Sequence, residues 1–216
     1  MDNWIDVINK VPAPTADINR FKSLEWTRKH MENPAYKLVS TPSRISKSDG
    51  EDNFFAETLK TSRTFSNWLC LMRQDYRTPA ESAKGTFRPS SNKPGRASQA
   101  PDNPDCQFLI ELSAGLNGFR DTMHGGVLCA ILDETLSVCV EFHRQLATDG
   151  RTLLYTGTLQ LTYLAPLPTP SVVLVKCWLE AREARKWYLK GQVVGEDGTV
   201  FTEGEGVWIA SRQTKL

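Results

Sequence analysis

The chain has 216 residues, of which 40% are apolar and 24% are charged, and both fractions are close to those of ordinary globular proteins. The longest unbroken apolar run extends only from Val127 to Leu132, far short of the ~20 residues that span a bilayer. A net charge of +1 gives no sign of a protein that binds nucleic acid or another polyanion.

The start of the chain and its cysteines bear on the compartment. Asp2 and Asp6 come early, and no basic segment precedes an apolar one, which argues against a secretory signal and, more weakly, against a mitochondrial presequence. Five scattered cysteines form no CxxC pair, and the three histidines lie far apart without a zinc pattern. We therefore expect a cytoplasmic protein with reduced, buried cysteines, no metal and no redox cofactor.

Residues 1–62 are predicted to form a helical and extended arm ahead of a domain at 63–216. In the arm, residues 15–18 can cap a helix that runs to about Met31. The polar stretch 41–52 is predicted to be a loop.

The domain is predicted to contain one long helix and six strands. Residues 79–104, rich in Ser, Pro, Gly, Lys and Arg, are predicted to be a flexible loop, and 116–123 a glycine-containing connection. The helix begins at Gly126 and ends at about Gln145, because neither Pro nor Gly interrupts that stretch. Strands are predicted at 64–73, 108–112, 153–164, 172–181, 187–195 and 199–211. This order predicts an α+β fold in which an antiparallel sheet wraps around one long helix.

The segment HGGVLCAILDET, residues 124–135, carries the chemistry. Residues three and four apart share a helix face, which places Asp133 on a face of small residues in an otherwise apolar helix. A carboxylate buried there is costly unless it is paired or faces a cavity. Gly125 and Gly126 let a ligand approach the helix N-terminus, where the dipole favours negative charge. Hydrolysis of an activated acyl group needs such an oxyanion hole and a carboxylate.

Three sequence features together resemble hotdog-fold thioesterases: His-Gly-Gly at 124–126 with an acid nine residues after the histidine, the stretch TGTLQLTYLAPLP from Thr156, and ARKWY from Ala184. The closest resemblance is to the acyl-CoA thioesterases of the PaaI/THEM-like branch, fungal relatives included. It covers about residues 105–211, and GEDNFFAETLK at 50–60 is similar to the arm of that branch. The resemblance implies a hotdog fold, hydrolysis of an acyl-CoA or acyl-carrier-protein thioester, and a homodimer or a dimer of dimers.

The resemblance also implies roles for single residues. Gly125 would supply the N–H of the oxyanion hole, and Asp133 would act as general base or nucleophile on the thioester carbonyl. Thr156 would come from the partner subunit and orient the water or the intermediate, so each site would combine two chains. His124 would fix the turn before the helix.

Substrate binding would involve residues at two places. Gly126 lies at the helix start, and Arg185 and Lys186 match a hairpin associated with the phosphates of CoA. A mitochondrial location is the alternative that the resemblance suggests.

Other interpretations stay open for these residues and for the function. Asp133 can be a buried acid satisfied by a backbone donor or an arginine. Thr156 is predicted to lie on one strand face with Thr158, Gln160 and Thr162, as part of a polar surface. The chain can also be a non-catalytic acyl-binding hotdog protein, or a hotdog dehydratase or cyclase in which the histidine of the motif acts on the substrate.

Two geometric points remain. A regular helix places Asp133 about 12 Å along its axis from Gly125, so one thioester carbon cannot contact both unless the turn folds over the helix or a water bridges them. Cys139 and His143 lie four residues apart on the helix, but no third orienting group accompanies them in the sequence. We therefore predict that these two residues only pack.

Overall fold

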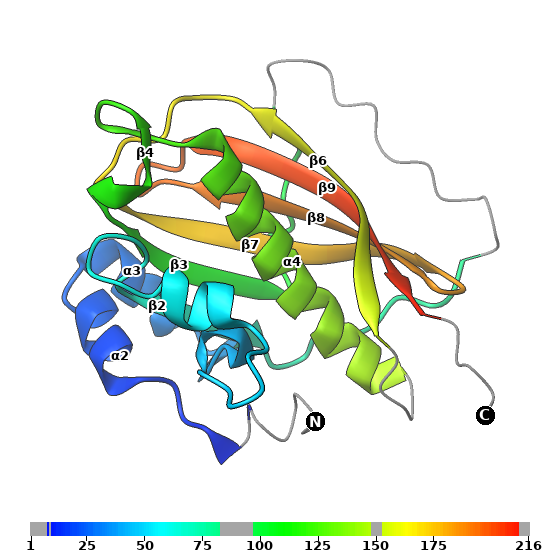
Figure 1. Ribbon diagram of the computed structural model, residues 1–216. Coiled ribbons are helices and arrows are strands. Elements are labelled where there is room, and N and C mark those ends of the chain that lie inside the picture. Colours follow the sequence, from blue (N-terminus) through cyan, green and yellow to red (C-terminus); the bar gives the residue numbers. More distant parts are fainter. Residues whose placement is uncertain (1–7, 9, 83–96, 148–152, 212–216) are drawn as a thin grey trace.

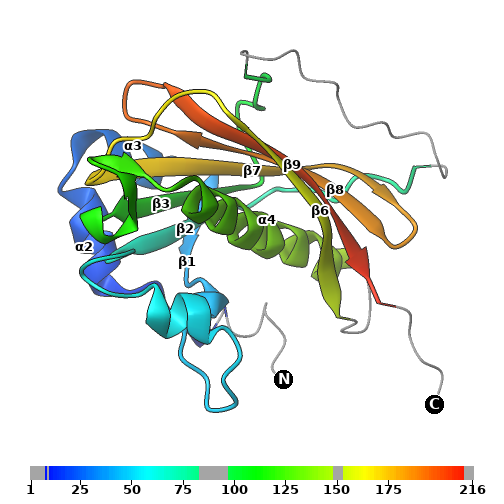
Figure 2. The same ribbon diagram turned by 45° about the horizontal axis from the view of Figure 1, so that its top comes forward.

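An antiparallel sheet of seven strands curls around one long helix, α4 (Gly125–Ala147). The computed structural model describes residues 8, 10–82, 97–147 and 153–211. Figure 1 shows α4 lying across the concave side of the sheet, and Figure 2 shows the sheet curving over it. The predicted α+β architecture is confirmed.

The sheet has the strand order β1-β2-β3-β7-β8-β9-β6. Its strands are β1 (Tyr36–Val39), β2 (Trp68–Arg73), β3 (Cys106–Leu112), β6 (Leu154–Tyr163), β7 (Ser171–Glu183), β8 (Lys186–Val194) and β9 (Val200–Ala210). All neighbouring pairs are antiparallel, and β6 is an edge strand. The six predicted strands all belong to this sheet. The predicted connection at 116–123 contains a small hairpin, β4 (Asn117–Phe119) and β5 (Thr122–Met123).

Alternation along β2 divides the apolar residues between two layers. Trp68 and Cys70 face the core around α4, whereas Leu69 and Leu71 face the other side of the sheet. There the helices α2 (Thr15–Lys22) and α3 (Glu25–Met31) pack on the sheet. This second core consists of Phe21, Met31, Tyr36, Leu69, Leu71, Leu109 and Leu174.

The arm differs from its prediction in two ways. The single helix predicted to run to about Met31 is broken between α2 and α3, where the buried Thr27 hydroxyl contacts the carbonyl oxygens of Phe21 and Leu24. Its N-cap is Pro14, without a side-chain cap, so the predicted capping within 15–18 is wrong. The prediction also missed β1, a four-residue strand that extends the sheet beyond β2.

Arg44 fastens the segment that follows β1. It lies at the end of a short 3-10 helix, η1 (Pro42–Arg44), within the predicted loop, and is 7% exposed. Its guanidinium donates hydrogen bonds to the carbonyl oxygens of Phe55 (2.7 Å), Leu59 (3.3 Å) and Phe65 (2.7 Å), and lies over the Trp68 ring. Burial lowers the pKa of Arg44 to about 10. These bonds hold the short π-helix η2 (Phe54–Thr58) and the entry to β2 in place.

Residues 79–82 and 97–104 contain neither helix nor strand, as predicted for part of the long loop, whereas 83–96 lie outside the described residues. In the described parts of the chain, no helix combines the length and apolarity needed to cross a membrane.

Candidate active site

The site begins at the N-terminus of α4, where His124 caps the helix. The His124 carbonyl accepts hydrogen bonds from the N–H groups of Val127 (3.0 Å) and Leu128 (3.3 Å), and its Nδ1 accepts one from the Gly126 N–H (2.9 Å). A Cβ on Gly126 would lie 3.0 Å from the imidazole, so the cap favours glycine there. His124 therefore orients the turn, and the Gly126 N–H is already engaged.

Gly125 offers a backbone donor at the same helix end. Among the residues that the structure describes, its N–H has no hydrogen-bond partner, while its carbonyl accepts a bond of 3.0 Å from the Tyr163 hydroxyl. An unpaired N–H in the first helical turn is the kind of donor that stabilises an oxyanion.

Asp133 and Thr156 form a hydrogen-bonded pair within one chain. Thr156 Oγ1 donates to Asp133 Oδ1 at 2.8 Å. The pair thus forms within one chain, whereas the expectation assigned Thr156 to the partner subunit. Because β6 is the edge strand beside α4, it brings its own threonine to the helix (Figure 1).

A β-bulge at Gly157 directs Thr156 toward the helix. Thr156 pairs with Trp208, but Thr158 pairs with Val207, so one residue is inserted between them. Trp208 and Val207 are adjacent and face opposite sides of the sheet, and their partners therefore do too. The prediction that Thr156 and Thr158 share a face is wrong for this reason. A Cβ on Gly157 would lie 2.8 Å from an Ile209 methyl carbon and 3.2 Å from the Val207 carbonyl oxygen, so the bulge favours glycine.

Gly125 and Asp133 lie apart on a regular helix. The helix begins at Gly125 itself, and at 1.5 Å per residue Asp133 lies about 12 Å further along the axis. The folded-over turn that would bring them together is not what the structure shows. A single chain therefore places the carboxylate and the free N–H at separate positions.

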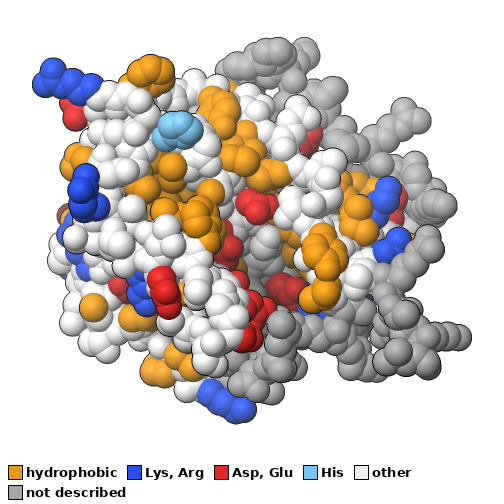
Figure 3. Space-filling model, in the orientation of Figure 1, with side chains coloured by type: hydrophobic (Ala, Val, Ile, Leu, Met, Phe, Trp, Pro, Cys, Tyr) orange, Lys and Arg blue, Asp and Glu red, His pale blue; other side chains and the backbone are white. Residues whose placement is uncertain are grey.

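Glu134 is a site residue that the sequence analysis did not single out, although it directly follows Asp133. Acidic side chains gather around a hollow on the face that carries α4 (Figure 3). Burial raises the pKa of Glu134 to about 7; the Ser43 hydroxyl opposes this shift, and the charges of Asp52 and Asp133 add to it. Ser43 belongs to η1 in the arm and is 1% exposed. The arm thus covers one side of the site helix.

Cys129 lies one turn before Asp133 on the same face of α4. All five cysteines are free, and Cys129 is the one that is not buried. Burial and, secondly, the charge of Asp133 raise the pKa of the Cys129 thiol. Its position between Gly125 and Asp133 makes its thiol a probe of this face of the helix.

Arg185 and Lys186 lie at the tip of the β7–β8 hairpin, where Ala184 adopts a left-handed conformation (φ 48°). Both are exposed, and the Arg185 guanidinium donates to the Ala210 carbonyl (2.6 Å). Lys186 pairs with Ile209, which pairs in turn with Tyr155 on β6. Two strand spacings, about 10 Å, therefore separate Lys186 from Tyr155, the residue before Thr156. The hairpin tip lies outside hydrogen-bonding distance of Asp133 and Thr156.

Cys139 and His143 do have a third group beside them. Asp105, at the entry to β3, lies within hydrogen-bonding distance of His143, contrary to the prediction that nothing orients this pair. Cys139 and His143 are fully buried and Asp105 is 7% exposed, so the trio is separate from the Asp133 site.

An antiparallel sheet curled around one long helix is the hotdog fold. Residues 121–202 match the model of the Thioesterase superfamily.

The similar proteins include the acyl-coenzyme A thioesterase THEM4 of Mus musculus, 30% identical over 102 residues that cover 47% of this chain and 41% of the relative. The Bos taurus THEM4 is 30% identical over 95 residues, which cover 44% of this chain and 36% of that relative. The chain thus spans less than half of the length of these curated relatives.

Solved structures with a similar fold include a hypothetical thioesterase with coenzyme A from Streptococcus pneumoniae. It is 12% identical, with a TM-score of 0.44, over 51% of this chain and 80% of that one. The PaaI protein of E. coli is 11% identical, with a TM-score of 0.43, over 50% of this chain and 74% of that one.

The raised pKa of Glu134 predicts a pH-dependent stability. Folding shifts this pKa from 4.5 to about 7, so the folded chain retains a proton that the unfolded chain releases between these values. The free energy of unfolding should therefore fall as the pH rises through this window. Glu134→Gln should remove about 1–3 kcal/mol of that fall between pH 4 and pH 8, measured by urea unfolding.

The exposed Glu196→Gln is the matched control and should keep the wild-type pH dependence. Parallel stability curves for wild type and Glu134→Gln would show that the carboxyl titrates normally.

Proposed function

We propose that the protein hydrolyses acyl-CoA thioesters. The observation that carries the proposal is the Asp133–Thr156 pair on the helix of a thioesterase-superfamily domain. The curated relatives named above are acyl-coenzyme A thioesterases, which favours CoA over a carrier protein as the thiol carrier. The exposed Arg185 and Lys186 at the hairpin tip offer positive charge for the phosphates of CoA.

In the proposed reaction, Thr156 holds one oxygen of Asp133 and leaves the other to act on the substrate. Asp133 removes a proton from a water molecule while the oxygen of that water attacks the thioester carbon. The carbonyl oxygen becomes an oxyanion, the carbon–sulfur bond breaks, and the thiolate takes up the proton. Direct attack by the carboxylate, through a mixed anhydride that water then cleaves, uses the same geometry.

We further propose that the oxyanion donor is the Gly125 N–H of a second copy. Because about 12 Å separates Gly125 from Asp133 on one helix, a two-fold related helix is the simplest source of an N–H opposite the carboxylate. The edge strand β6 offers a surface for that copy: Tyr155 and Tyr163 are 58% and 55% exposed, and Leu153, just before the strand, is 52% exposed. A homodimer would then contain two equivalent sites.

A non-catalytic acyl-binding protein is the second candidate, because a raised-pKa acid and a partly buried thiol beside the pair also suit a binding groove. Turnover of a panel of acyl-CoAs decides between the two, since a binding protein would retain the thioester intact.

Asp133→Asn tests the carboxylate. The amide has the same shape but cannot accept the proton, so kcat for acyl-CoA hydrolysis should fall about 10²–10⁴-fold with little change in KM. Asp102→Asn, in an exposed loop, should keep wild-type kcat. Wild-type turnover by folded Asp133→Asn would remove Asp133 from the mechanism.

Subunit mixing tests which chain supplies each group. Gly125→Pro deletes the N–H at the first helical residue, a position that proline tolerates, and each mutant homodimer should be nearly inactive. In an equal mixture with Asp133→Ala, half of the dimers are heterodimers with one intact site of two, so activity should recover to about a quarter of wild type. Gly125→Ala, which keeps the N–H and places its Cβ 3.4 Å from the Tyr163 ring, is the control.

The mixture of Asp133→Ala with Thr156→Ala should not recover, because both residues belong to the same site of one chain. Recovery in this mixture alone would assign Thr156 to the partner, and no recovery in either would show that Gly125 acts within its own chain.

Thiol labelling tests whether the substrate binds beside Asp133. Methyl methanethiosulfonate should modify Cys129 first, because the other four cysteines are buried, and should lower hydrolysis at least tenfold by filling the space beside Asp133. Cys129→Ser should resist the reagent and keep its activity, followed by loss of the thioester absorbance. Full activity after complete labelling of Cys129 would place the substrate elsewhere.

A further inference from the structure

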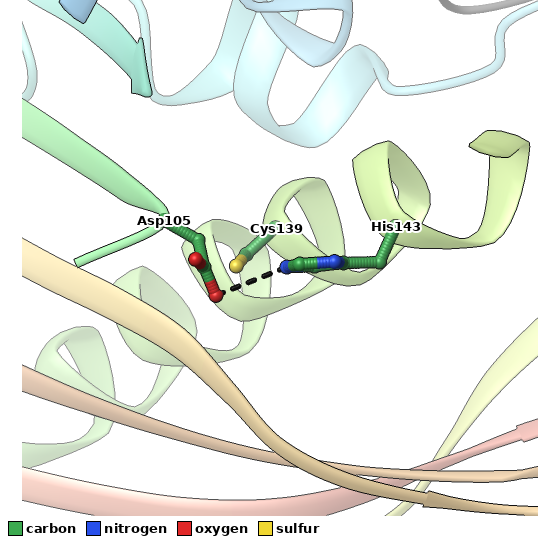
Figure 4. A group of neighbouring side chains, drawn as sticks. All are labelled: Asp105, Cys139 and His143. Atoms are coloured by element: carbon green, nitrogen blue, oxygen red, sulfur yellow. Dashed lines mark hydrogen bonds and ion pairs between the residues drawn. The ribbon is translucent and has the colours of Figure 1, made fainter. Parts of the chain in front are cut away.

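Three different donor groups converge in the core beside the C-terminal half of α4. Cys139 and His143 lie one turn apart on the helix, and Asp105 directly precedes β3 (Figure 4). The Cys139 Sγ, a His143 ring nitrogen and an Asp105 carboxylate oxygen all lie within 4.8 Å of one another. Cys139 and His143 are 0% exposed, and Asp105 is 7% exposed. The group is therefore closed to solvent and distinct from the Asp133 site.

Hydrogen bonds around the group fix the histidine tautomer. The Thr78 hydroxyl lies 3.3 Å from the His143 carbonyl, to which it donates, and 3.2 Å from His143 Nδ1. Because its proton goes to the carbonyl, the hydroxyl oxygen accepts from Nδ1–H. The other nitrogen, Nε2, then faces Asp105 Oδ2 at 3.0 Å. In a neutral imidazole with this tautomer both of these atoms are acceptors, so either a proton or a metal cation lies between them.

The carboxylate is oriented in the same way. Arg73 forms an ion pair of 3.0 Å with Asp105 Oδ1, and the Leu179 N–H donates to Oδ2 at 2.9 Å. A second lone pair of Oδ2 stays directed at the histidine nitrogen. In metal sites, the histidine nitrogen and the carboxylate oxygen that do not contact the metal are typically held by hydrogen bonds or ion pairs.

We propose that Asp105, Cys139 and His143 bind a structural zinc ion. A proton between Nε2 and Oδ2 would satisfy two of the three donors, but it would leave the thiol without a role, whereas Zn²⁺ uses nitrogen, sulfur and oxygen together. The Cys106 thiol lies beside that of Cys139 and is the next protein donor for a fourth position.

The charge balance favours a buried ion of this kind. Binding expels two protons to solvent, that of the Cys139 thiol and the one shared by His143 and Asp105, so Zn²⁺ with one thiolate, one carboxylate and a neutral imidazole has no net charge. A neutral complex is far less costly to bury than an isolated ion. The ion would join α4 to the start of β3, which suits a structural site.

The test begins with the wild-type chain, expressed without a histidine tag in zinc-supplemented medium. Elemental analysis should give about one zinc per chain, and replacement by Co²⁺ should produce a thiolate-to-cobalt absorption band. Cys139→Ala should lose the band and most of the metal, and His143→Gln most of the metal. Cys70→Ala, which removes an equally buried thiol outside the group, should keep both. Thr78→Val should weaken Zn²⁺ binding about tenfold through loss of the orienting bond.

Wild-type protein that contains no zinc and gives no cobalt band overturns the proposal, and this measurement does not depend on any variant folding. Metal that remains bound to Cys139→Ala also overturns it. In either case the trio is an imidazolium–carboxylate ion pair next to a packed thiol.

Discussion

Burial of the apolar side of α4 against the concave sheet is the constraint on which the rest of the molecule depends. Ile131, Leu132 and Leu136 are fully buried between the helix and the strands. Packing of the apolar side also fixes the rotation of the helix about its axis. The residues on its other side then have to face away from the sheet. Asp133 is one of these residues, so the position of the candidate carboxylate follows from hydrophobic packing rather than from any bond of its own.

The threonine partner depends on a local irregularity instead. A regular strand would alternate strictly, and the single extra residue at Gly157 reverses which side each residue of β6 faces. The strand can therefore present Thr156 to the helix and Thr158 to the opposite side. This arrangement places the carboxylate and the hydroxyl in one chain, and the separation from Gly125 along the helix leaves the amide donor to a second copy in our proposal.

The sequence allowed the long helix, six strands and the Asp133 face to be predicted, because each of these depends on local periodicity and on turn residues. Four other features depend on contacts between distant segments: the strand β1, the break before α3, the bulge in β6 and the approach of Asp105 to His143. Four residues at 36–39 are too few to give a clear alternating pattern, and a bulge changes pairing without a distinctive composition. Glu134 could have been noticed, since an acid beside Asp133 in an apolar helix is unusual, but the approach of Ser43 from the arm depends on the tertiary fold.

The hydrogen bonds of Arg44 also bear on how the molecule unfolds. The carbonyl oxygens it binds belong to Phe55, Leu59 and Phe65, in the last part of the arm and at the approach to β2. Detaching that segment alone would leave a guanidinium in the core without acceptors, a penalty of about 3–5 kcal/mol. Such a penalty is a large fraction of the ~5–15 kcal/mol by which whole domains are stable. Opening of this segment alone therefore costs a substantial part of that stability, which couples the end of the arm to the sheet.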